Sequence, residues 1–95
     1  MTSSEYPTAS PIVEFSRNFS DIFAAASERD KKHMTASMEL GHGFLSSEFD
    51  SEAASNASAA LCHFQRAFRE GQTEEQIAYH LRLASGFADL ALGKR

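Results

Sequence analysis

The sequence contains one cysteine, two prolines and no tryptophan, and it has no long apolar run. A lone cysteine, Cys62, cannot form an intrachain disulfide and is typical of a reducing compartment, so we expect a cytoplasmic protein. No stretch approaches the ~20 consecutive apolar residues that cross a bilayer. The first residues, Met1 to Glu5, have neither the basic nor the apolar part of a signal peptide. We therefore expect no contact with a membrane.

Positive charge is also scarce. Nine Lys and Arg stand against thirteen Asp and Glu, which gives a net charge of −4. This balance disfavours binding to DNA, RNA or an anionic surface. Most of the excess of acids over bases lies in the first third of the chain, where it predicts a surface for an unidentified basic protein partner. The acids assigned to this surface are Glu14, Asp21, Glu28 and Asp30.

The motifs of the common enzyme classes are missing as well. The sequence has no nucleophile elbow, phosphate-binding loop, dinucleotide fingerprint or zinc-protease helix. Cys62 and His63 are neighbours, but successive side chains of a helix project about 100° apart and do not form a nucleophile and base pair. By helical phase we expect Cys62 on the polar face of its helix. These observations predict a protein with no enzymatic activity and no cofactor.

The residues that are present predict helices. Apolar residues make up 42% of the 95 positions, and they recur at spacings of three and four instead of two. A chain of this length forms one domain. We assign residues 1–10 to a flexible N-terminal tail and residues 11–95 to a single helical domain. Ser10 followed by Pro11 is typical of a helix start.

Two interruptions divide the first half of the domain. The polar run 27–32 carries no core residue, so residues 11–45 form either one helix or two, and we favour two. Ser27 or Asp30 could cap the second of these helices. Gly41 and Gly43, on either side of His42, then end or bend it.

The third helix begins after several polar residues that suit an N-cap, and alanine dominates its contact face. Small side chains there allow a neighbouring helix to approach closely, while Phe64 and Phe68 are expected to fill the space at the far end. Gly71 predicts a left-handed end to this helix, and Thr73 with Gln76 predicts a capping box at the start of the next. The fold class is therefore all-α, a small four-helix bundle-like domain with a C-terminal antiparallel helical hairpin.

The fourth helix carries an apolar arc that is wider than one neighbouring helix needs. A second copy of the chain is the commonest cover for such a face, so we expect a homodimer. The central histidine of the arc is expected to be a satisfied core or interface residue. The residues assigned to self-association are Ile77, His80, Leu83, Ala84, Phe87 and Leu90. The sequence thus predicts a small non-enzymatic helical protein–protein interaction module, namely a regulator, adaptor or inhibitor.

A second class of function rests on a resemblance. Residues 73–95 resemble the helix-turn-helix of bacterial repressors, because Ile77, Ala78 and Leu81 match the run that packs its first helix. The resemblance implies a DNA-binding regulator. Arg82 stands where that family usually has glycine, and the segment after it offers almost no base-reading side chains.

A third class is a metal-binding helical bundle. Glu39 precedes His42 at the Glu-x-x-His spacing of di-iron bundles, and His80 lies on another apolar face. No second Glu-x-x-His pair occurs in the sequence, so we expect no metal.

Overall fold

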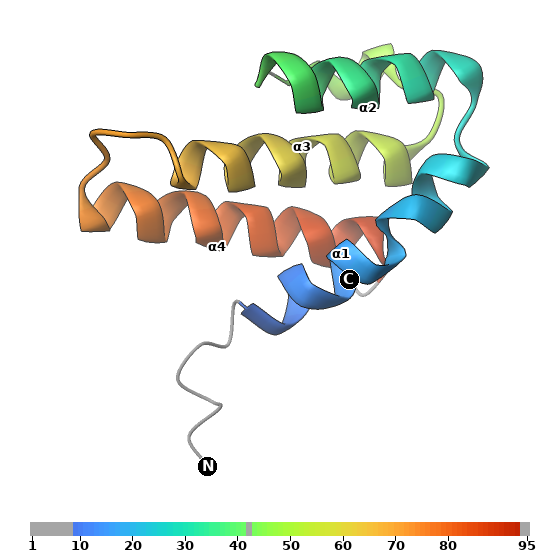
Figure 1. The fold of residues 1–95 in the computed structure, drawn as a ribbon. Coiled ribbons are helices and arrows are strands. Elements are labelled where there is room, and N and C mark those ends of the chain that lie inside the picture. Colours follow the sequence, from blue (N-terminus) through green and yellow to red (C-terminus); the bar gives the residue numbers. More distant parts are fainter. Residues whose placement is uncertain (1–8, 42, 94–95) are drawn as a thin grey trace.

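The computed structural model describes residues 9–41 and 43–93, and these residues form helices and connections without any strand. Figure 1 shows the elements in chain order. They are α1 (Ala9–Ala25), α2 (Glu28–Leu40), the short 3₁₀ helix η2 (Ser46–Glu48), α3 (Glu52–Ala67) and α4 (Glu74–Ala91). The predicted all-α class with four main helices is confirmed.

The helix α3 lies between α2 and α4, and it runs antiparallel to α4 (Figure 1). The contact between α3 and α4 is the most extensive in the molecule, which confirms the predicted hairpin. The first helix, α1, packs on both α4 and α3. It begins at Ala9, two residues before the expected start at Pro11, while residues 1–8 of the predicted tail lie outside the described residues.

Local capping explains the break between α1 and α2. The side chain of Ser27 accepts a hydrogen bond from the main-chain N–H of Asp30 and thereby satisfies a free donor of the first turn of α2. At the other end Gly41 adopts the left-handed conformation (φ 71°), and its N–H donates to the carbonyl of Ser37. Both the break and the glycine stop were predicted from sequence, and both are confirmed.

The end of α3 differs from the prediction. The helix ends at Ala67, and Gly71, although left-handed (φ 83°), lies within the following turn. The side chain of Gln72 donates to the carbonyl of Arg66 at 2.7 Å, so a side chain satisfies the last turn in place of the expected glycine motif. Phe68 therefore leaves the helical register and is 68% exposed, and the prediction that it fills the core was wrong.

The capping box that starts α4 is confirmed. The hydroxyl of Thr73 accepts from the N–H of Gln76, and the side chain of Gln76 accepts from the N–H of Thr73 at 2.9 Å.

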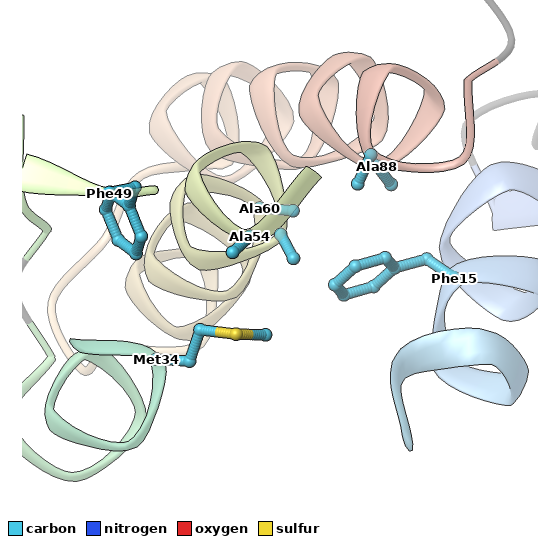
Figure 2. Packing of buried hydrophobic residues seen from close by; sticks show 8 residues of the cluster. Phe15, Met34, Phe49, Ala54, Ala60 and Ala88 are labelled. Carbon is cyan, nitrogen blue, oxygen red and sulfur yellow. The ribbon is translucent and has the colours of Figure 1, made fainter. Parts of the chain in front are cut away.

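Alanines of α3 and α4 form the centre of the core, and larger side chains from the other elements pack on them. Figure 2 shows Phe15 reaching from α1 toward Ala60 and Ala88, while Met34 of α2 extends below Ala54 of α3 toward the ring of Phe15. The expected close approach at the alanine face is present. Phe49, which is buried just before α3, belongs to the same cluster.

Cys62 is buried, and the prediction that it lies on the polar face of its helix was wrong. The residue is only 4% exposed, and its thiol lies 3.7 Å from the carbonyl oxygen of Gly41 at the end of α2. The buried hydroxyls of Ser37 and Ser58 meet in the same interface. Because α2 covers this side of α3, residues that helical phase places away from α4 are buried as well.

Candidate functional site

The side of α4 turned away from the core carries a second row of residues, which we call the outer stripe: Tyr79, Leu83, Gly86 and Leu90. Their spacings of four, three and four residues place them on one face of the helix. Tyr79 is 53% exposed and Leu90 is 39% exposed, although both are large and mainly apolar. A spacing of this kind is typical of the contact seam between two packed helices.

A hollow of about 400 Å³ opens on the outer stripe. Gly86 has no side chain, so the surface is depressed between the larger side chains around it. The hollow is lined by Arg82, Leu83, Gly86, Phe87 and Leu90.

The charges beside the outer stripe lie on one flank. Arg82 and Asp89 are seven residues apart, which is close to two helical turns, so the cation and the carboxylate follow one another along the same side. Arg82 is exposed and Asp89 is half-buried. Within α4 as the structure describes it, the opposite flank carries His80 and Phe87 and no carboxylate or ammonium group.

The structure divides the residues that sequence assigned to self-association. Leu83 and Leu90 lie on the outer stripe, and His80 and Phe87 are half-buried beside it. Ile77 is half-buried on the side of α4 that carries Ala84, because the two residues are seven positions apart. Ala84 is only 1% exposed and faces the core with Ala88, so it cannot contact a second copy in this conformation. The apolar arc read from sequence thus combined two opposite faces of α4.

Three aromatic rings stack where α4 meets α3. The ring of His63 lies parallel to that of Phe87 at 5.7 Å and near that of His80 at 5.4 Å. The Nδ1 atoms of the two histidines are 3.2 Å apart, so one ring donates a hydrogen bond from its Nδ1–H to the Nδ1 of the other. Burial, the charge of Arg66 and the neighbouring His80 all lower the pKa of His63 from 6.5. His80 is therefore the satisfied histidine that its position predicted.

The acids assigned to a partner surface are also divided. Asp30 is 0% exposed, and its carboxylate accepts hydrogen bonds from the N–H groups of Asp50 and Ser51, so its assignment to a binding surface was wrong. Asp21 and Glu28 are exposed, whereas Glu14 is half-buried. Glu28 lies 3.8 Å from the ammonium group of Lys31, so the surface around it has mixed charge.

The helix-turn-helix does not form, and two of the three residues of the metal alternative lie apart. α4 continues through Arg82 from Glu74 to Ala91, so the turn required by a helix-turn-helix is absent. Glu39 belongs to α2 and His80 to α4, which lie on opposite sides of α3 (Figure 1). His42 lies outside the described residues. Among residues 9–41 and 43–93, no three His, Cys, Asp or Glu side chains are grouped so that they could hold a metal ion.

Sequence reasoning missed two residues of the outer stripe and one residue that lines its hollow. Tyr79 and Gly86 were not assigned to the self-association face, although their phase relative to Leu83 and Leu90 could have identified them, and Arg82 lines the hollow from the flank. The signal was available as a second heptad-like spacing on the same helix.

Within the part of the chain that the structure describes, no helix is both long and apolar enough to cross a membrane. No family model, curated protein or solved structure matches the chain.

Proposed function

We propose that this chain is a small non-enzymatic helical interaction module that associates with a second copy of itself through the outer stripe of α4. The observation that carries the proposal is the exposure of Tyr79 and Leu90 in line with Leu83 on one helical face. A monomer that leaves such a row in water exposes apolar surface that promotes non-specific association. A symmetric copy covers the row with an identical one.

The rest of the domain supports an assignment to self-association over catalysis. The polar side chains with defined partners serve helix ends and helix contacts, as Asp30, Ser37 and Gln72 illustrate. The surfaces that a dimer leaves open, including Asp21 and Glu28, would then be available to a different protein. In this arrangement the module acts as a regulator, adaptor or inhibitor.

Light scattering coupled to size exclusion tests the proposal. Wild-type protein at micromolar concentration is expected to show twice the chain mass of 10.4 kDa. Leu90→Lys places a charge on the outer stripe and should give a monomer with an unchanged helical spectrum, since a cation near the end of a helix is favourable to its dipole. Ala78→Lys is the matched control, because Ala78 is exposed on α4 away from the outer stripe. A wild-type monomer at every concentration contradicts the proposal.

A further inference from the structure

We infer that two copies of α4 pair in antiparallel orientation, with Leu83 of each copy placed in the hollow over Gly86 of the other. The inference rests on the proposed self-association and specifies its geometry. In an antiparallel pair centred between Ala84 and Ser85, a residue on one side of the centre faces the residue equally far on the other side. Leu83 then faces Gly86, and Tyr79 faces Leu90.

The shapes of these residues fit that register. In the two contacts next to the two-fold axis, a large side chain meets a glycine. Leu83 of the second copy thereby enters the hollow of about 400 Å³. The two-fold axis makes this contact twice, once over each Gly86. In a parallel pair Leu83 would face Leu83 and Gly86 would face Gly86, which leaves the hollow empty and loses the packing contacts of its lining.

The charges favour the same orientation. In an antiparallel pair, the flank that carries Arg82 and Asp89 in one copy lies beside the same flank of the other copy. Arg82 of each copy therefore meets Asp89 of the other. A parallel seam would place the flank carrying Arg82 and Asp89 against the flank carrying His80 and Phe87. That flank offers Arg82 no carboxylate.

Disulfide trapping distinguishes the two orientations. In a Cys62→Ala background, a tagged chain carries Tyr79→Cys and an untagged chain carries Leu90→Cys. The antiparallel register places these two cysteines side by side in the mixed dimer. In either variant alone, the two copies of the cysteine would be separated by about 11 residues of helix, or roughly 16 Å, which is beyond the ~7 Å that a disulfide allows between Cα atoms. We expect oxidation to link the two variants to each other and neither variant to itself.

The other outcomes are separable. If each variant links to itself and not to the other, the pair is parallel and the inference is overturned. If light scattering shows a dimer but no cysteine on the outer stripe is trapped, the interface lies elsewhere. If the protein is a monomer, the proposed function itself fails. Ala78→Cys, on the same helix but off the outer stripe, controls for random collisions.

Charge exchange gives an independent readout. Arg82→Glu is expected to weaken the dimer roughly two- to tenfold in Kd, because it places a carboxylate against Asp89 of the second copy at two symmetric sites. The double variant Arg82→Glu with Asp89→Arg should recover affinity, since the pair is restored with its signs reversed. If the double variant is weakened by the sum of the two single effects on Kd, the two residues do not meet.

Discussion

The carboxylate of Asp30 joins the first turn of α2 to the two residues before α3 by accepting from the N–H of Ser51 at 3.0 Å and from that of Asp50 at 2.7 Å. The contact is reinforced from the other side, where the hydroxyl of Ser27 donates to the Asp50 carboxylate at 2.6 Å and Arg29 lies 3.1 Å from it. A carboxylate in this place also interacts favourably with the positive ends of two helix dipoles. One buried acid thus ties the start of α2 to the residues that lead into α3.

Asp30→Asn is expected to lower the free energy of unfolding by on the order of 2 kcal/mol, because the amide has one accepting oxygen where two are used. Urea unfolding followed by circular dichroism measures the change. Asp21→Asn removes an exposed acid and should stay within about 0.5 kcal/mol of wild type. Equal stability of the two variants would show that the Asp30 contacts contribute nothing.

The alanine face of α3 should tolerate no added bulk. Ala57 is 0% exposed, so Ala57→Leu forces neighbouring helices apart and is expected to cost about 1 to 3 kcal/mol. Ala53 is exposed on the same helix, and Ala53→Leu is the matched control. Chemical denaturation of both variants tests the difference, and a stable Ala57→Leu protein would mean that this interface is loosely packed.

Stability should depend on pH through His63. Its pKa is lowered in the folded protein, mainly by burial and then by Arg66 and His80, so the unfolded chain binds a proton more readily. By linkage, stability is complete above about pH 6.5 and decreases as the pH falls from there toward the lower folded-state pKa. His63→Gln should flatten the decrease in a series of urea titrations between about pH 5 and 7.5. An unchanged slope would assign the pH dependence to other groups.

Gly71 should be sensitive because of its backbone and not because of crowding. Its φ is 83°, and nothing lies within 4 Å of the position that a Cβ would occupy. Gly71→Ala is therefore expected to cost about 1 kcal/mol in thermal or chemical unfolding, from left-handed strain alone. Gly71→Asn should cost less, since asparagine adopts this conformation more readily. If alanine and asparagine behave alike, the strain is relieved by movement of the turn.

The features that could be read from sequence are those set by neighbours along the chain. The caps at Ser27 and Thr73 and the stop at Gly41 each involve partners within four residues, so local patterns specify them. Helical periodicity likewise located the alanine face of α3. These local signals were sufficient for the number of helices and for the hairpin.

The features that sequence missed depend on contacts between distant elements. Asp30 looked like part of an acidic surface because the partners of its carboxylate, Asp50 and Ser51, lie about 20 residues further along the chain. Cys62 looked exposed because periodicity gives the angle of a side chain and not which helices surround it. Ala84 and Leu83 were merged into one face for the same reason, although one lies in the core and the other on the outer stripe.

The position of α1 has a consequence for the order of folding. The hairpin of α3 and α4 closes through the short connection 68–73, whereas the contact of Phe15 with Ala88 joins residues near opposite ends of the chain. Long loops are entropically costly to close before other contacts exist, so local pairings form first. We expect pulse-labelled hydrogen exchange to protect the amides of α3 and α4 before those of α1, which would make α1 the last helix to acquire protection during refolding.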